Sequence, residues 1–348
     1  MRLLLRIGLT GAGARVEDEP MTAAPVTVVI PGFMGSTLAD AGSGKVLWDS
    51  FRLFWTDLRK LRFDQGLEIE ALRDLWPVYR SLMRNLRRRG HRVLFFPYDW
   101  RRSAEQAAAE FGLFIKKYVP DGPLNIVSHS MGGFVTALWL ADGGAERFES
   151  NGRIACVAMP AKGVEMALLS MVAGYSLLAL YNFRADRRLV RELAWEVPSL
   201  YEMLPHYPKV CDPDVWPEGL GVKHDLLAEG RRMRERFESS LPVLGELGRE
   251  GSAALFAAQG RKTVGIRFDD EGRLDPKPTA CGDGDGWVLA ESVEVDNVPT
   301  YLFRLGAGDS LGLGIFAVLG WVVGSHPLLP MFKRINRAII GFLETGTV

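Results

Sequence analysis

Short apolar runs alternate with amphipathic stretches along most of the chain of 348 residues. Runs rich in β-branched residues predict buried strands, and apolar positions spaced three and four residues apart predict helices. The predicted strands are 26–30, 92–96, 124–127, 154–159, 253–258 and 300–305. The predicted helices in these parts of the chain are 76–89, 104–118, 132–141 and 330–343. Strands that alternate with helices predict an α/β fold, with a mostly parallel central sheet and helices on both of its faces.

The alternation stops in the middle of the chain, between about residues 161 and 252. This stretch is mostly helical in pattern and contains several prolines, so we expect an inserted helical cap over the carboxyl edge of the sheet. Within the first part of the core, a segment of about residues 36 to 60 is expected to be lid-like. The predicted division is an N-terminal extension (1–24), a first part of the core (25–160), the cap (161–252) and a second part of the core (253–348).

Composition narrows the class of protein. Hydrophobic residues make up 47% of the chain and charged residues 24%, which is ordinary for a globular protein. Lys and Arg together number 42, as do Asp and Glu, so there is no bulk positive field to attract nucleic acid. The apolar stretches 166–181 and 311–323 are too short to cross a bilayer, and we expect buried elements or a lipid-facing surface there.

The N-terminal sequence and the cysteines bear on the cellular location of the protein. Arg6 interrupts the first apolar stretch too early for a signal-peptide core, and Met21 is an alternative start. The three cysteines are an odd number without metal-ligand spacing, which does not indicate a disulfide framework. A cytoplasmic location is therefore favoured, with secretion as the alternative.

The segment Ser128-His129-Ser130-Met131-Gly132 follows the predicted strand 124–127. A serine with very small residues two before and two after it is typical of a tight strand-to-helix turn that presents a nucleophilic hydroxyl. The usual pattern has Gly at the first small position, where this chain has Ser128. We predict that Ser130 is the nucleophile, and the alternative is a Gly-rich turn without a catalytic role.

A serine nucleophile needs a base and an acid that orients the base. In a hydrolase of this topology the chain order is nucleophile, acid, histidine. Asp285 is the preferred acid because its glycine-rich loop, residues 282–288, allows a tight turn and because Asp-x-x-Val returns Val288 to the core. Asp283 is the substitute, and a surface turn or a cation loop is the alternative interpretation. Of the five histidines only His326 follows the acid, which makes it the predicted base.

Backbone amides are the expected donors to the oxyanion of an acyl-transfer reaction. One is the amide of Met131, directly after the nucleophile, and the other is the amide of Phe33, after the first strand. Pro31-Gly32 before Phe33 and Gly35-Ser36 after it allow the unusual loop path that such a donor needs.

Five motifs occur in order over residues 26–343, and two of them are much more specific than the serine turn. The motifs are 30–36, 97–102, 128–132, 198–205 and 282–288. The specific ones, Pro97-Tyr98-Asp99-Trp100-Arg101-Arg102 and Pro198-Ser199-Leu200-Tyr201-Glu202-Met203-Leu204-Pro205, resemble the lecithin:cholesterol acyltransferase family, which includes the lysosomal phospholipase/acyltransferase. The resemblance implies an α/β-hydrolase fold with cap and lid, a triad of Ser130, Asp285 and His326, and acyl transfer from lipid esters. It also assigns Phe33 and Met131 as oxyanion donors.

The chain also departs from that family. The segment between the first two motifs is short and shows no cysteine-closed lid loop. The spacing between Asp285 and His326 is stretched by the apolar, glycine-rich run 306–324, and Ala158-Met159-Pro160 stands where family members often carry Gly-Thr-Pro. These departures bear on the substrate and the acyl acceptor.

Several further residues are candidates for contact with substrate. They are Met34, Trp48, Trp55, Leu168 and Met171. The two tryptophans lie near the lid-like segment, where they either contact a lipid or pack inside. The helix predicted over 164–181 is apolar on almost all sides and is expected to form either core or an acyl-chain channel. Asp99, Trp100 and Arg101 are expected to fix their loop by an ion pair and ring packing.

The sequence thus predicts a serine esterase, lipase or acyltransferase that acts on lipid carboxylic esters through an acyl-enzyme. The expected partners are a lipid or another acyl ester and the surface of a membrane or micelle, without nucleic acid. This chemistry requires no metal and no organic cofactor. The alternatives are a non-catalytic protein of the same fold that binds an apolar ligand, a membrane-docking scaffold, and a thioesterase or amidase.

Overall fold

The computed structural model describes residues 25–49, 57–74, 77–148, 152–175, 186–305 and 326–348. In this part of the chain, six strands form a central sheet in which every neighbouring pair is parallel. The strand order is β11-β8-β7-β6-β1-β5. The strands are β1 (Val26–Ile30), β5 (Arg92–Phe95), β6 (Leu124–His129), β7 (Ile154–Val157), β8 (Ala253–Gln259) and β11 (Thr300–Arg304).

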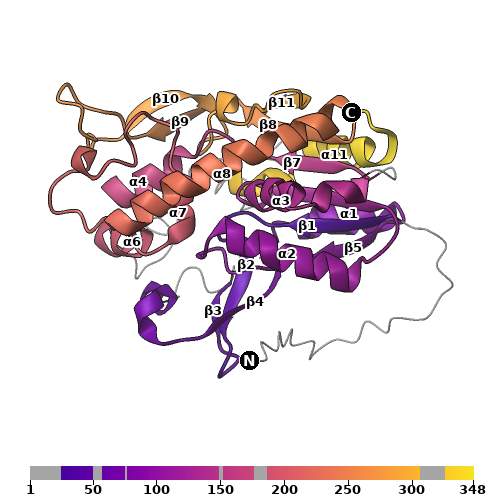
Figure 1. Cartoon of the computed structure of the whole chain (residues 1–348), viewed down its shortest axis with the longest axis horizontal. Coiled ribbons are helices and arrows are strands. Elements are labelled where there is room, and N and C mark those ends of the chain that lie inside the picture. Colours follow the sequence, from indigo (N-terminus) through magenta and orange to yellow (C-terminus); the bar gives the residue numbers. More distant parts are fainter. Residues whose placement is uncertain (1–24, 50–56, 75–76, 149–151, 176–185, 306–325) are drawn as a thin grey trace.

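Helices cover both faces of this sheet (Figure 1). Phe111, Phe134 and Phe237 of α2 (Ala104–Tyr118), α3 (Gly132–Ala141) and α8 (His224–Arg249) pack in one apolar cluster with Val28. The second cluster joins Val29 to α1 (Arg80–Arg88) and α11 (Lys333–Thr345) on the opposite face. Because alternate β1 residues enter cores on both faces, the strand is buried along its whole length and is rich in β-branched residues, as is usual in parallel sheets.

The strand order reverses between β1 and β6. From β1 the chain forms β5 on one side, and it then returns to place β6 on the other side of β1. In the register of this pair Ile30 lies opposite Ser128, so the loops that begin at Pro31 and Ser130 leave the sheet side by side. A reversal of this kind opens a crevice at the carboxyl ends of the strands, where α/β proteins bind their ligands.

Between β7 and β8 the described residues are mostly helical. The helices of this region are α4 (Glu165–Ala173), α6 (Arg187–Ala194), α7 (Pro198–Glu202) and α8. The helix predicted over 164–181 is too long, because α4 ends at Ala173 and Gly174 takes the left-handed conformation (φ 66°) that closes helices. The division into core and cap stays a prediction.

Two small antiparallel sheets were not predicted by the hydrophobic pattern. One has the order β3-β2-β4 and the other pairs β10 with β9. Their strands are β2 (Ser36–Asp40), β3 (Val46–Trp48), β4 (Ile69–Asp74), β9 (Arg261–Gly265) and β10 (Thr279–Gly284). Register shifts interrupt all three pairings, so the side chains do not keep the period of two that reveals a strand in sequence.

Several predicted elements are confirmed with their bounds, namely the strand 26–30 and the helices 104–118 and 132–141. The final helix begins at Lys333, later than predicted, because Pro330 lies in a preceding 3₁₀ helix, His326–Met331. The other 3₁₀ helices of the described residues are Leu58–Leu61, Phe63–Gln65, Gly144–Phe148, Pro213–Val215 and Ala290–Ser292.

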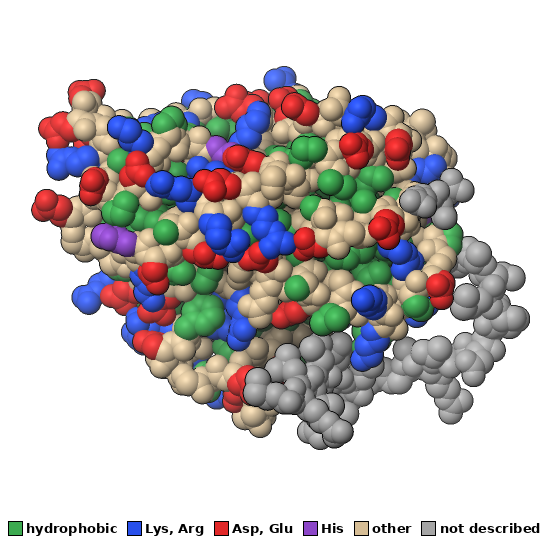
Figure 2. Space-filling view, viewed as in Figure 1, with side chains coloured by type: hydrophobic (Ala, Val, Ile, Leu, Met, Phe, Trp, Pro, Cys, Tyr) green, Lys and Arg blue, Asp and Glu red, His purple; other side chains and the backbone are tan. Residues whose placement is uncertain are grey.

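The surface charges and the helix lengths bear on possible contacts with nucleic acid and membranes. On the face shown in Figure 2, basic and acidic side chains are interspersed, in keeping with the balanced charge of the sequence. Among the described residues, every helix is too short or too polar to cross a membrane. The apolar stretch 311–323 lies outside the described residues.

Candidate active site

Ser130 lies on the turn between β6 and α3, in a left-handed backbone conformation with φ of 53°. Such a conformation is uncommon for a residue other than glycine and is maintained only where the surroundings enforce it. Here the amide of Ser130 donates to the carbonyl of Val157 at 2.8 Å. This is the geometry of a sharp strand-to-helix turn that raises the serine hydroxyl above the edge of the sheet.

The glycines around this turn are required by close backbone contacts. A Cβ on Gly132 would lie 2.7 Å from the carbonyl oxygens of Ile30 and Pro31, and one on Gly32 would lie 2.8 Å from Cβ of Ser130. Ser128 fits where glycine is usual, and its hydroxyl donates to the buried Cys156 Sγ at 3.3 Å. The loop after β1 therefore packs directly against the serine turn.

The structure brings Ser130, His326 and Asp285 together. His326 Nε2 lies 2.8 Å from Ser130 Oγ, and His326 Nδ1 lies 2.7 Å from Asp285 Oδ2. All three residues are buried, with exposed fractions of 6% or less. The three side chains form one continuous hydrogen-bonded chain, although 41 and 196 residues separate its bonded pairs.

Asp285 is held in place by the loop that follows β10. Its Oδ1 accepts from the amides of Trp287 at 3.0 Å and Val288 at 2.9 Å, which leaves Oδ2 for His326. The ring of Trp287 stacks on His326 with centroids 5.5 Å apart. Asp283, the substitute acid, is instead exposed and accepts from the amide of Gly260 at 2.8 Å.

The two amides predicted as oxyanion donors lie on either side of the crevice. Met131 precedes the first turn of α3, where the helix terminus favours negative charge. Phe33 lies in a turn closed by a 2.9 Å hydrogen bond from the amide of Gly35 to the carbonyl of Gly32. Neither amide donates to another of the residues that the structure describes.

Two buried tyrosines that sequence reasoning missed hold the loop after β1. Tyr98 donates to the carbonyl of Pro31 at 2.9 Å, and the amide of Gly32 donates to the hydroxyl of Tyr79 at 2.9 Å. These are the two ends of a single peptide group. Tyr98 belongs to one of the specific sequence motifs, whereas nothing in the pattern marks Tyr79.

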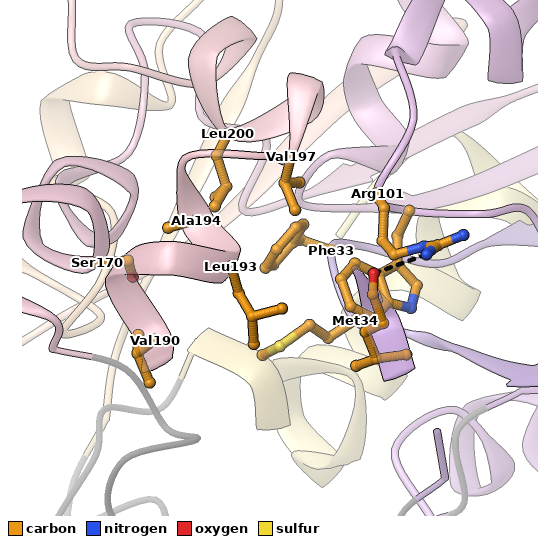
Figure 3. A pocket seen from close by; sticks show the side chains of 11 residues that line it. Phe33, Met34, Arg101, Ser170, Val190, Leu193, Ala194, Val197 and Leu200 are labelled. Carbon is orange, nitrogen blue, oxygen red and sulfur yellow. Dashed lines mark hydrogen bonds between the residues drawn. The ribbon is translucent and has the colours of Figure 1, made fainter. Parts of the chain in front are cut away.

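A narrow apolar cavity of about 40 Å³ begins at this loop and extends beneath α6 and α7 (Figure 3). In Figure 3 the side chains of Phe33 and Met34 face Leu193 and Val197. Arg101 is engaged elsewhere, since it donates to Asp99 and to the carbonyl of Leu61. The cavity is lined by Phe33, Met34, Leu61, Trp100, Arg101, Ser170, Val190, Leu193, Ala194, Val197 and Leu200.

The residues predicted to contact substrate have different positions. Met34 lines the cavity, whereas Trp48 is buried behind the loop and its Nε1 donates to the carbonyl of Met34 at 3.0 Å. Leu168 and Met171 are completely buried on α4 and do not line this cavity. Trp55 lies outside the described residues. A role of these residues in substrate binding stays a prediction.

The two most specific motifs bond to each other. Within the first, Arg101 and Asp99 form the expected ion pair at 2.6 Å. From the second, Ser199 donates to the carbonyl of Trp100 at 2.7 Å, and a Glu202 oxygen accepts from the amide of Ala104 at 2.8 Å. These bonds join α7 to the start of α2.

Known structures support the fold. A chain of the Tle4–Tli4 complex has a TM-score of 0.59 at 13% identity, and the match covers 93% of this chain and 99% of that one. The chain has the α/β-hydrolase fold.

Other structures similar to this chain have lower TM-scores. The lipase BlEst2 from Bacillus licheniformis matches at 14% identity with a TM-score of 0.42, over 87% of this chain and 94% of the lipase. Phospholipase PlaB from Legionella pneumophila matches at 10% identity with a TM-score of 0.41, over 93% of this chain and 62% of PlaB. Protein-family models and curated proteins show no match. The resemblance to the lecithin:cholesterol acyltransferase family therefore stays a prediction.

Proposed function

We propose that this α/β-hydrolase is a serine esterase or lipase that cleaves carboxylic esters with an apolar acyl chain. The observation that carries the proposal is the hydrogen-bonded chain Ser130 Oγ–His326–Asp285. In this mechanism His326 Nε2 takes the hydroxyl proton as Ser130 attacks the ester carbonyl. Asp285 keeps His326 in the tautomer that can accept this proton and stabilises the imidazolium that forms.

The negative charge that develops on the carbonyl oxygen needs hydrogen-bond donors that are already in position. The amides of Phe33 and Met131 supply them. His326 then donates its proton to the departing alcohol, which leaves an acyl group bonded to Ser130. Water attacks this acyl-enzyme while His326 takes a proton from the water, and the carboxylic acid is released with Ser130 regenerated.

The cavity beside Phe33 supports the proposed substrate class. An acyl chain whose carbonyl oxygen points at the Phe33 amide has an apolar wall on α6 and α7 within reach. Burial of the chain against Leu193, Val197 and Leu200 contributes roughly 0.8 kcal/mol per methylene group. Acyl chains longer than acetyl are therefore favoured.

Transfer of the acyl group to an alcohol is the second candidate. Ser130 and His326 are 6% and 2% exposed, which limits the access of water to an acyl-enzyme. An acceptor alcohol that enters with the substrate would then compete well with water. Adding a primary alcohol during turnover and measuring the ratio of transferred ester to free acid tests this candidate.

The test of the proposed function is turnover of p-nitrophenyl esters with acyl chains of graded length. We expect activity in the wild type that rises from acetyl to longer chains, and its loss in Ser130→Ala. Ser240→Ala is the matched control, because Ser240 is a buried serine of α8 that donates only to the carbonyl of Phe237. A wild type that is as inert as Ser130→Ala would instead favour a non-catalytic protein that binds an apolar ligand.

A further inference from the structure

His129 directly precedes the proposed nucleophile, and the mechanism above gives it no role. It is buried, and both ring nitrogens have partners. Nε2 lies 3.1 Å from the backbone carbonyl of His326, and Nδ1 lies 2.9 Å from the hydroxyl of Tyr79. A carbonyl oxygen only accepts, so Nε2 carries the hydrogen and Nδ1 accepts from Tyr79. Burial lowers the pKa of His129, which keeps the ring in this neutral form.

Tyr79 continues the same chain of hydrogen bonds. Its side chain is 1% exposed. The hydroxyl of Tyr79 donates to His129, and its oxygen accepts from the amide of Gly32. The directions of all three bonds are therefore consistent. The fit is close, because a Cβ on Gly35 would lie only 2.8 Å from the tyrosine oxygen.

This chain of hydrogen bonds joins the loop that carries the proposed oxyanion donor to the backbone of His326, the proposed base. Gly32 precedes Phe33, whose amide is the proposed oxyanion donor. With Tyr98 on the Pro31 carbonyl and Tyr79 on the Gly32 amide, the peptide group before this donor is held at both ends. At the other end, Asp285 holds the imidazole of His326, while His129 holds its backbone carbonyl.

We propose that Tyr79 and His129 are positioning residues that keep the oxyanion loop and the base in a fixed relation around Ser130. This inference rests on the proposed function. Neither side chain touches the substrate, and no proton moves along the chain during turnover. The effect is geometric, because donors that stabilise a transition state must be aligned before the reaction begins.

Tyr79→Phe tests the first link, since it removes one hydroxyl and leaves the ring. We expect kcat to fall about tenfold, less than the 10²-fold cost of deleting an oxyanion donor, with little change in KM. Tyr201→Phe is the matched control. Tyr201 is equally buried, donates to the carbonyl of Trp195 and accepts from the amide of Lys223, so it loses the same kinds of bond away from Ser130.

Two substitutions of His129 test the second link. Glutamine offers an NH₂ group that donates and a carbonyl oxygen that accepts, whereas phenylalanine offers neither, so His129→Gln should retain more kcat than His129→Phe at similar thermal stability. The double variant Tyr79→Phe/His129→Phe should be no slower than the slower single variant, because both break the same chain. If Tyr79→Phe does not fold, the two His129 variants still decide the question.

Reaction of Ser130 with a fluorophosphonate separates the two proposals. A wild type that neither reacts nor turns over overturns both of them. A wild type that is active, with Tyr79→Phe no slower than Tyr201→Phe or with additive losses in the double variant, overturns the positioning role alone. The expected result is slower labelling of Ser130 in Tyr79→Phe and His129→Phe, in parallel with kcat, and unchanged labelling in Tyr201→Phe.

Discussion

Ser130 combines two properties that rarely occur together, a left-handed backbone and a side chain larger than that of glycine. The strain is maintained because the turn is enclosed by β7, by the loop after β1 and by α3. The small residues beside Ser130 follow from the same enclosure. The turn could be predicted from sequence because it requires small residues at fixed positions before and after the serine.

Two glycine-to-alanine substitutions should have opposite effects. In Gly132→Ala the new methyl group meets two backbone oxygens at 2.7 Å, so we expect a clear loss of both thermal stability and esterase activity. In Gly112→Ala, within α2, the nearest atom is a Trp139 carbon at 3.4 Å, an ordinary contact. Alanine is favoured in helices by up to about 1 kcal/mol, so this variant should be more stable. Thermal unfolding of both proteins tests the pair, and a stable, active Gly132→Ala would contradict the packing described here.

Asp285→Asn should reduce kcat by about 10⁴-fold while the protein stays folded. The amide NH₂ group can donate to His326 Nδ1, which favours the tautomer whose Nε2 carries the hydrogen and cannot take the proton of Ser130. Asp283→Asn is the control, since Asp283 bonds to Gly260 on the surface. Steady-state kinetics with a p-nitrophenyl ester distinguishes the two residues. Equal losses in both variants, or a loss in Asp283→Asn alone, would show that the acid is misassigned.

Among the helices and strands, the hydrophobic pattern predicted those whose burial is continuous or regularly periodic. The inner strands β1, β6, β7 and β8 are buried almost throughout and are mainly apolar, α3 is buried along nearly its whole length, and α2 keeps a regular helical period. The antiparallel strands β2, β3 and β4 escaped notice because bulges shift their register. The end of α4 was missed because one left-handed glycine outweighed an apolar stretch that continues beyond it.

The candidate site shows the same division. The small residues around the turn indicated Ser130, the glycine-rich loop with its Asp-x-x-Val spacing indicated Asp285, and the chain order of nucleophile, acid and histidine singled out His326. Tyr79 was out of reach, because its importance comes from one hydroxyl placed between Gly32 and His129 by tertiary packing. The cavity wall on α6 was missed for a similar reason: leucine and valine there have the same pattern whether they face core or cavity.

The position of α6 leads to a prediction about chain length. Leu193→Trp should fill part of the cavity and lower kcat/KM for long acyl esters, while acetyl and propionyl esters react as before. Arg188→Trp, on the exposed side of the same helix, is the control for adding an indole ring. Kinetics over the ester series gives the comparison. An unchanged chain-length profile in Leu193→Trp would exclude this cavity as the acyl site.

At the scale of the whole molecule, two buried carboxyl groups link stability to pH. Burial raises the pKa of Glu165 and of Glu202 to about 7 from the ordinary 4.5. Between about pH 4.5 and 7 the folded chain therefore holds more protons than the unfolded chain at these sites. Their contribution to the free energy of unfolding is largest at low pH and is lost as the pH rises through this window.

Thermal unfolding at pH 5 and pH 8 tests this linkage. We expect Glu202→Gln to weaken the dependence on pH and to raise the melting temperature at pH 8 relative to the wild type, because glutamine still accepts from Ala104 without a buried charge. Glu105→Gln replaces a partly exposed glutamate of α2, next to the Ala104 amide that Glu202 binds, and should leave the difference between the two pH values nearly as it is. A Glu202→Gln protein with the full wild-type dependence would contradict the assignment.

The central claim is that Ser130 becomes acylated. The most direct measurement is mass spectrometry of the protein quenched during turnover of a slowly released long-chain ester, followed by peptide mapping. We expect an added acyl group on the peptide that contains Ser130, present in the wild type and absent in Ser130→Ala. Ester cleavage without any adduct, or an adduct on another residue that persists in Ser130→Ala, would contradict it.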